Sequence, residues 1–154
     1  MTFSVPALLY TLGCCLISII IASKPANKSN NKAWFQNLKH PDNSLVLKYI
    51  NSFGFGFFLL WGCVLYSFFV RGIIAPIVIT TVVILFMGMS PFLLFEIKNL
   101  KSFNLLNTVL FVLIPAVVFF LLQTNLVLAI LVSMYFLWVV YETTYFYRLM
   151  KLNE

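Results

Sequence analysis

The segment 133–148, with the sequence SMYFLWVVYETTYFYR, carries the side chains with which this chain could do chemistry. They are Tyr135, Trp138, Glu142 and Tyr145, with Tyr141 at their edge. On an α-helix, residues three or four positions apart share one face, so these side chains form one stripe. Phenol hydroxyls, an indole N–H and a carboxylate need partners that hydrocarbon does not offer. The stripe is therefore predicted to face protein or a ligand cavity.

Glu142 is the one acidic residue inside the long apolar stretches of the chain. Acidic residues at such positions are costly and usually have a role. Three interpretations stay open. Glu142 could pair structurally with a lysine of the first loop, a tyrosine, or the amides of Asn104 and Asn107. It could contact a ligand, or it could transfer protons.

No set of residues typical of an enzyme or a metal site accompanies this stripe. The chain lacks the GxxxxGK[ST], GxSxG and HExxH motifs and any pair of acids at helical spacing. Its three cysteines, Cys14, Cys15 and Cys63, lack metal-ligand spacing and are interpreted as small packing residues. His40, the one histidine, is expected in a loop. No catalytic residue, metal or cofactor is predicted.

The elements that must position the stripe are membrane-spanning helices. Of the 154 residues, 62% are hydrophobic and 9% are charged, which is far from the composition of soluble domains. Since roughly 20 apolar residues cross a bilayer as a helix, the sequence predicts one all-α integral membrane bundle of five transmembrane helices over residues 1–154. The spans are expected near residues 3–23, 49–70, 73–95, 103–122 and 126–147. The first is interpreted as a retained helix, because no positive charge precedes it.

The basic residues predict how the bundle is oriented in the membrane. The net charge of +6 would suggest nucleic acid for a soluble protein, but here it bears on topology, and no nucleic acid is expected. Nine of the ten lysines and arginines fall on one side of the predicted spans, and only Arg71 falls on the other. By the positive-inside rule, the N-terminus lies outside, and the first loop and the C-terminus lie in the cytoplasm.

The first loop, residues 24–48, has two different halves. The stretch from Asn27 to Lys32 is interpreted as a solvated loop. Trp34, Phe35 and Leu38 predict a short interfacial helix that stops before Pro41. This helix would be either an aromatic anchor at the lipid headgroups or a lid that closes over a pocket.

Two further spans carry features that favour a small opening and helix–helix contacts. Pro91 frees a backbone carbonyl one turn earlier and bends the third span, and Ser90 could satisfy part of that deficit. Asn104 and Asn107 offer amides for hydrogen bonds between helices. In the second span, glycines favour close packing.

Three segments resemble the translocator protein family, also called tryptophan-rich sensory proteins. Trp34–Phe35–x–x–Leu38–x–x–Pro41 resembles its W-[FY]-x-x-L-x-x-P signature after the first span. Ser90–Pro91–Phe92 is similar to its segment near the end of span three, and residues 135–144 resemble its Y-x-x-W-x-x-[FY]-A-T-T stretch. Five departures from the family pattern stand out. Asp42–Asn43–Ser44 follows Pro41 where the family has a tryptophan and prolines, and Ser52–Phe53–Gly54–Phe55 replaces a P-x-W-G segment. Met89 replaces a tryptophan, Glu142 an alanine and Phe146 an asparagine.

The resemblance implies a five-helix bundle, often dimeric, that binds tetrapyrroles, sterols or synthetic aromatic ligands beneath the first loop. The leading hypothesis is therefore a membrane receptor or carrier-like protein for a flat hydrophobic ligand of the tetrapyrrole or sterol class. The residues expected at the ligand are Trp34, Phe35, Leu38, Phe53, Phe57, Met89, Pro91, Tyr135, Trp138, Tyr141, Glu142 and Tyr145. The alternatives are a structural or assembly subunit that docks a partner helix and, ranked last, a tetrapyrrole-modifying enzyme. A pocket behind Trp138 of roughly several hundred Å³ favours binding, and tight packing there favours the structural role.

Overall fold

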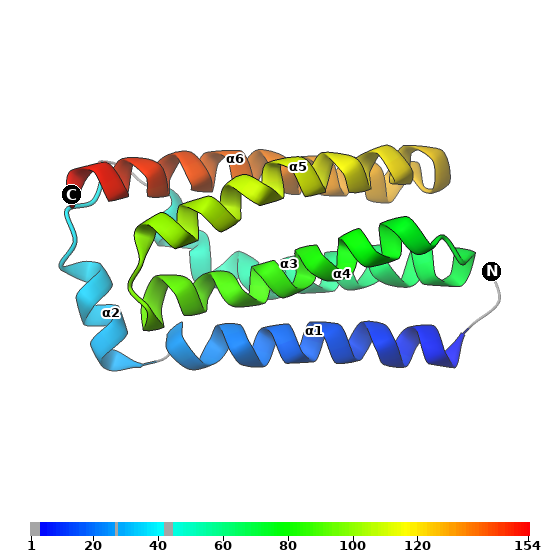
Figure 1. The fold of residues 1–154 in the computed structure, drawn as a ribbon, viewed down its shortest axis with the longest axis horizontal. Coiled ribbons are helices and arrows are strands. Elements are labelled where there is room, and N and C mark those ends of the chain that lie inside the picture. The colour runs from blue at the N-terminus through cyan, green and yellow to red at the C-terminus, as the bar shows by residue number, and fades with distance from the viewer. Residues whose placement is uncertain (1–3, 27, 42–44) are drawn as a thin grey trace.

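The computed structural model describes residues 4–26, 28–41 and 45–154, with the backbone alone for residue 26 and residues 45–55. In this part of the chain, long helices run side by side along one axis, and a short helix crosses one end (Figure 1). The N-terminus lies at the opposite end from the short helix and the C-terminus. The elements are α1 (Val5–Ala26), α2 (Ser29–Gln36), α3 (Leu45–Arg71), α4 (Ile74–Pro91), the π-helical η1 (Phe92–Glu96), α5 (Leu100–Thr124) and α6 (Leu126–Leu152).

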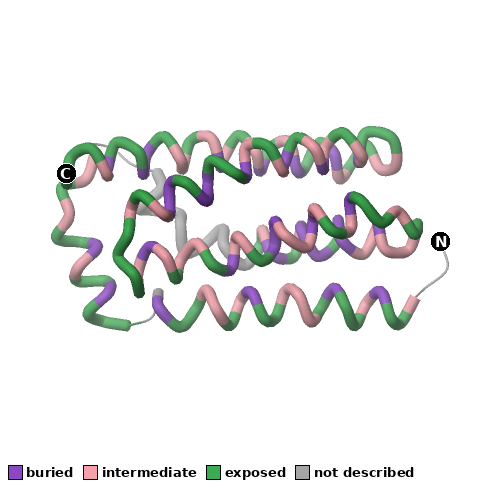
Figure 2. The backbone as a smooth tube through the Cα atoms, viewed as in Figure 1, coloured by how far each residue is buried: buried purple, intermediate pink, exposed green. Residues whose placement is uncertain are grey.

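The bundle is that of a multi-pass membrane protein. Within the described residues, α1, α4 with η1, α5 and α6 are long and apolar enough to cross a membrane, and residues Gly56–Arg71 of α3 form a shorter apolar helix. Exposed positions run along the whole length of the bundle (Figure 2). Many of them are large and apolar, such as Val112 and Leu137, which are 71% and 68% exposed. Such a surface is stable against lipid and not against water. The predicted all-α membrane class is confirmed.

The helix α2 begins earlier than the sequence suggested. Residues 29–32 were expected in a solvated loop, and this expectation is wrong because α2 starts at Ser29. Two contacts with distant residues explain the difference. Asn31 is buried and its Nδ2 donates to the carbonyl of Pro25 at 2.9 Å. Lys28 pairs with Glu96 at 2.6 Å, so the polar side chains stabilise a docked helix.

Small residues let α1 lie close to α3 and α4. A Cβ on Gly88 would lie 2.8 Å from the Cα of Ser18, and one on Gly62 would lie 3.2 Å from the Sγ of Cys15. Close approach of helix backbones at small residues is the usual packing mode in membranes. Gly13, by contrast, has nothing within 4 Å of such a Cβ. The α1–α4 contact therefore depends on Ser18 and Gly88.

The hairpin of α5 and α6 turns the α6 stripe toward the bundle. Asn125 ends α5, and its side chain accepts a hydrogen bond from the backbone of Leu128 at 3.2 Å as the N-cap of α6. At the other end of the hairpin, Asn104 Nδ2 donates to the carbonyl of Phe146 at 3.2 Å, which confirms the predicted amide contact between helices.

At the C-terminus, Lys151 and then Lys101 hold the pKa of the Glu154 carboxyl below its usual value.

Candidate functional site

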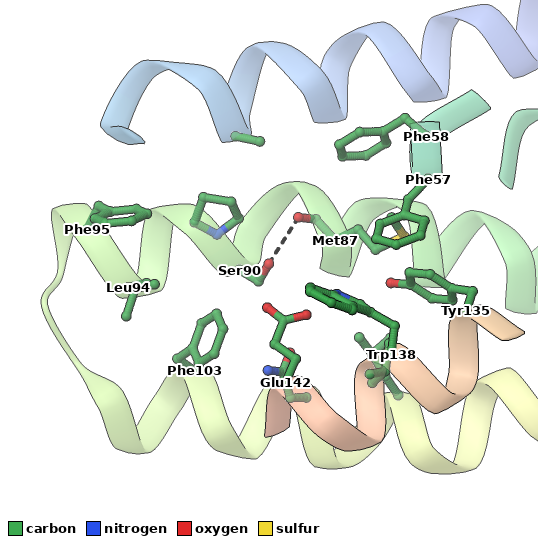
Figure 3. Close-up of a pocket in the computed structure, with 15 residues that line it drawn as sticks. Phe57, Phe58, Met87, Ser90, Leu94, Phe95, Phe103, Tyr135, Trp138 and Glu142 are labelled. Carbon is green, nitrogen blue, oxygen red and sulfur yellow. Dashed lines mark hydrogen bonds between the residues drawn. The ribbon is translucent and has the colours of Figure 1, made fainter. Parts of the chain in front are cut away.

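A cavity of about 160 Å³ lies between the helices, where the α6 stripe faces the bend of α4 (Figure 3). Tyr135, Trp138 and Glu142 line it from α6. Their spacing of three and four residues places them on consecutive turns of one helix face. In Figure 3 the carboxylate of Glu142 points into the cavity, toward Ser90 and the indole of Trp138. The stripe therefore faces a cavity, as its polar groups predicted.

The end of α4 at Pro91, where the α-helix changes to a π-helix, forms the opposite side. Pro91 has no N–H to donate to the carbonyl of Met87, and the Ser90 hydroxyl donates to that carbonyl instead, at 3.1 Å. The chain then widens into the π-helical η1, which adds Leu94 and Phe95 to the lining. These contacts confirm the predicted role of Ser90 and the expected opening near Pro91.

Helix α5 adds a polar group, Asn107, which the sequence offered as a possible structural partner of Glu142 and not as a ligand contact. Asn107 lines the cavity and is 5% exposed, and its Nδ2 has no hydrogen-bond partner within the described residues. Its neighbour Phe103 lines the cavity as well. Helical periodicity marks Asn107 as a candidate for contacts between helices, but only the packing of α5 against α6 brings it to the cavity of Glu142.

Glu142 forms none of the ion pairs found in the described part of the chain. Those pairs join Lys28 to Glu96, and both Lys101 and Lys151 to Glu154. In Figure 3 the indole of Trp138, one turn earlier on α6, lies beside the Glu142 carboxylate. A carboxylate at this depth therefore has neutral and aromatic neighbours, and any cation it meets would have to come from a ligand or from a residue outside the described set.

An apolar groove of about 570 Å³ lies on the outer side of α3 and α6. Gly56, Leu60, Leu131 and Met134 line it, together with three aromatic side chains that also line the cavity. These are Phe57, Tyr135 and Trp138, here named the aromatic wall. The rings of Phe57 and Tyr135 meet edge to face at 4.5 Å, and those of Phe57 and Trp138 lie 6.3 Å apart. One layer of side chains thus separates the cavity that holds the Glu142 carboxylate from a groove on the outer side of α3 and α6.

The residues predicted as a lid lie one layer beyond the cavity. Phe35 is buried at the end of the bundle, with ring distances of 5.5 Å to Phe95 and 6.2 Å to Phe146. Trp34 and Leu38 pack against the same cluster. Because Phe95 belongs both to this cluster and to the cavity lining, α2 covers the end of the cavity indirectly.

Three other predicted residues, Tyr141, Met89 and Tyr145, are not among the described residues that line the cavity or the groove. Tyr141 and Met89 are 39% and 41% exposed. Tyr145 is buried, and its hydroxyl bonds to Nδ1 of His40 at 2.7 Å. The side chain of Phe53 lies outside the described residues. Of the predicted set, the structure brings Phe57, Pro91, Tyr135, Trp138 and Glu142 together at the cavity.

His40, which no sequence motif marks, connects the first loop to α6. Its Nε2 pairs with the carbonyl of Phe35 at 2.8 Å, while Nδ1 pairs with Tyr145. Its ring stacks on Tyr145 and meets Phe35 edge to face. No local pattern marks this role, because Tyr145 lies 105 positions away in the chain.

The site contains no ready metal centre. Within the described residues, no three histidine, cysteine, aspartate or glutamate side chains gather as a group that could hold a metal ion. Its polar groups are one carboxylate, one amide, one indole and the two hydroxyls of Ser90 and Tyr135, and aromatic rings surround them. This set can bind and orient a ligand.

These features define a class: a multi-pass helical membrane protein with a carboxylate in an interior cavity and an apolar groove beside it. No protein-family model matches the chain, and no curated protein matches it either. The function must therefore be argued from the site itself.

Proposed function

We propose that this chain is a receptor or carrier-like membrane protein of the translocator type. Its helices α1, α3, α4 with η1, α5 and α6 would each cross the bilayer, which gives five spans. The N-terminus would lie outside, and the first loop and the C-terminus in the cytoplasm. The positions of the two termini at opposite ends of the bundle (Figure 1) and the strong bias of lysine and arginine toward one end support this arrangement.

The proposed ligand is a flat hydrophobic molecule of the tetrapyrrole or sterol class. The aromatic wall between groove and cavity is the observation that carries this proposal. Pockets for drug-sized ligands hold roughly 300–1,000 Å³. The cavity, at about 160 Å³, is too small for such a ligand, whereas the groove, at about 570 Å³, has the required size. The body of the ligand would therefore lie in the groove and stack on the rings of the wall.

Binding of protoporphyrin to the purified protein in lipid nanodiscs tests this proposal. The absorbance of the porphyrin itself should be followed, so that replacing a tryptophan does not remove the reporter. Trp138→Ala should weaken binding about tenfold or more, because it deletes the largest ring of the aromatic wall. The same variants should be titrated with a fluorescent sterol.

Leu137→Ala is the matched control for this experiment, since Leu137 neighbours Trp138 on α6 and is 68% exposed. It should bind the porphyrin like the wild type. Equal affinities of Trp138→Ala and the wild type for both ligands would overturn the proposal.

The groove also supports a second candidate function, a structural subunit that docks a partner helix. Gly56 lies in the groove, and nothing lies within 4 Å of a Cβ built on it, so a neighbouring helix could approach α3 closely. Met134→Cys, in a chain whose native cysteines are replaced by alanine, should then form disulfide-linked homodimers in membranes. Cross-linking that porphyrin does not reduce would favour this candidate over ligand binding.

A further inference from the structure

The interior cavity holds a complementary pair of polar groups that the proposed function of the groove does not use. The Glu142 carboxylate accepts hydrogen bonds, and Asn107 Nδ2 donates them. Asn107 is 5% exposed, and its Nδ2 lacks a partner within the described part of the chain. Buried donors are nearly always paired, so an unpaired one in a residue that lines a cavity marks a place for an acceptor atom of a ligand.

A cation in the same cavity would compensate the negative charge of the Glu142 carboxylate. No lysine or arginine pairs with Glu142 among the described residues, whose ion pairs all lie at the end of the bundle that carries α2 and the C-terminus. A charged carboxylate inside a membrane span is costly unless an opposite charge compensates it. A ligand that brings a positive charge would supply that compensation.

The walls of the cavity suit an organic cation. Phe57, Tyr135 and Trp138 line one side, and Phe58 and Phe103 add two more aromatic rings to the lining. The faces of aromatic rings attract substituted ammonium groups, and a cage of several rings is the usual site for them. The alkyl groups of such a cation also fit apolar walls better than a strongly hydrated metal ion would.

The volume limits the size of the ligand. An engineered protein cavity of roughly 150 Å³ binds benzene. The cavity here, at about 160 Å³, therefore has room for a molecule of similar size. A small ammonium compound that carries one hydroxyl group meets this limit.

We propose that the interior cavity binds a small hydroxyl-bearing organic ammonium compound of about the size of choline. Its ammonium group lies against Glu142 and the aromatic wall, and its hydroxyl accepts a hydrogen bond from Asn107 Nδ2. This site is separate from the groove, so it does not depend on the proposed binding of a tetrapyrrole or sterol. The competing occupant is water.

Isothermal titration calorimetry of the full chain with choline chloride tests the proposal. The nanodiscs should contain phosphatidylglycerol, because phosphatidylcholine would present choline headgroups of its own. Two further titrations serve as ligand controls: sodium chloride at the same ionic strength, and 3,3-dimethylbutan-1-ol, the neutral carbon isostere of choline. Choline should bind about tenfold or more tightly than the isostere, because only choline pairs with the carboxylate. Equal affinities would overturn the proposal, and so would the absence of choline binding, which would mean that the cavity holds water only.

Two variants then assign the contacts. Glu142→Gln keeps the side-chain shape but removes the charge, and should weaken choline binding about tenfold or more. Asn107→Ala should weaken choline binding about threefold or more but leave tetramethylammonium binding unchanged, since that cation has no hydroxyl. Glu154→Gln, which removes an exposed carboxylate at the C-terminus, is the charge-matched control and should bind like the wild type.

Each variant tests one of the two proposed contacts with choline. Wild-type affinity in Glu142→Gln would overturn the ionic contact. Equal weakening of both cations by Asn107→Ala would overturn the hydroxyl contact. Porphyrin binding measured on the same samples separates this proposal from the previous one, because loss of choline binding alone leaves the groove ligand unaffected.

Discussion

At the scale of single residues, the buried amides of α5 have two different environments. Asn104 Nδ2 donates to the carbonyls of Leu100 at 2.9 Å and Phe146 at 3.2 Å, and so joins α5 to α6. Asn107 Nδ2, one turn later, has no such partner in the described structure and lines the cavity. The first amide is a structural contact, and the second is available to a ligand.

Leucine substitutions should separate these two roles. Asn107→Leu removes an unpaired donor and fills part of the cavity, so the protein without added ligand should gain about 1 kcal/mol in stability. Asn104→Leu, the matched control on the same helix, breaks a contact between helices and should lose about 1–2 kcal/mol. Thermal unfolding in detergent measures both as shifts in Tm. A loss in Asn107→Leu as large as that in Asn104→Leu would show that Asn107 has a structural role.

The hydroxyl of Tyr145 should determine how firmly the first loop docks. Tyr145→Phe removes the partner of His40 Nδ1 and leaves the ring packing intact. We expect local opening of residues 29–41 to become easier by about 1 kcal/mol, the usual worth of such a hydrogen bond. Hydrogen exchange of that segment measures the change.

Tyr147→Phe is the control for this experiment, because Tyr147 is 53% exposed. It should leave exchange of the segment unchanged. If both variants exchange alike, the bond between His40 and Tyr145 contributes nothing to loop docking.

At the scale of elements, the contact of α1 with α4 positions the bend that opens the cavity. Ser18 and Gly88 bring these two helices together just before Pro91, so the backbone of α4 has no room to move toward α1. The widened turn η1 then directs Leu94 and Phe95 inward. The cavity therefore depends on two features of α4. These are the tight contact of Gly88 with Ser18 of α1 and the missing N–H of Pro91.

Alanine substitutions at two glycines test this packing. Gly88→Ala would place its Cβ 2.8 Å from the backbone of Ser18, so the helices must separate, and a loss of about 1–3 kcal/mol is expected. Gly13→Ala meets open space and improves helix propensity, so its stability should stay within about 1 kcal/mol of the wild type. The measurement is again thermal unfolding in detergent. Equal stability of the two variants would show that the α1–α4 contact is not tight.

At the scale of the whole molecule, the proposed orientation follows from charge and from the positions of the chain ends. The short helix α2 and the C-terminus share one end of the bundle, and the N-terminus lies at the other (Figure 1). Asn153 joins the C-terminus to the segment that follows α2, since its side chain pairs with the backbone N–H and carbonyl of Lys39 at 3.0 Å each. These residues would meet the cytoplasm together.

Labelling of single cysteines in intact cells tests this orientation. In a chain whose native cysteines are replaced by alanine, a membrane-impermeant maleimide should label Ser4→Cys. It should fail to label Lys32→Cys and Lys151→Cys until the cells are permeabilised, because the positive-inside rule places these two positions in the cytoplasm. Labelling of the two lysine positions before permeabilisation would reverse the proposed topology.

The sequence alone determined the features that depend on neighbours along the chain. Long apolar runs must become membrane helices, because a bilayer offers no partners for an open backbone. The spacing of Tyr135, Trp138 and Glu142 placed them on one face, and the polarity of that face required it to turn inward. Pro91 likewise indicated an interruption of the helix, since its ring removes a backbone donor.

Only the tertiary structure decided which residues from different helices meet. Asn107 comes to the cavity of Glu142, and His40 comes to Tyr145, through contacts between segments far apart in the chain. Asn31 and Lys28 make α2 helical through partners outside α2, although their local sequence is that of a loop. The cavity volume is the space that remains after the helices pack. Sequence periodicity describes one helix at a time, whereas the volume of the cavity depends on how all the helices pack together.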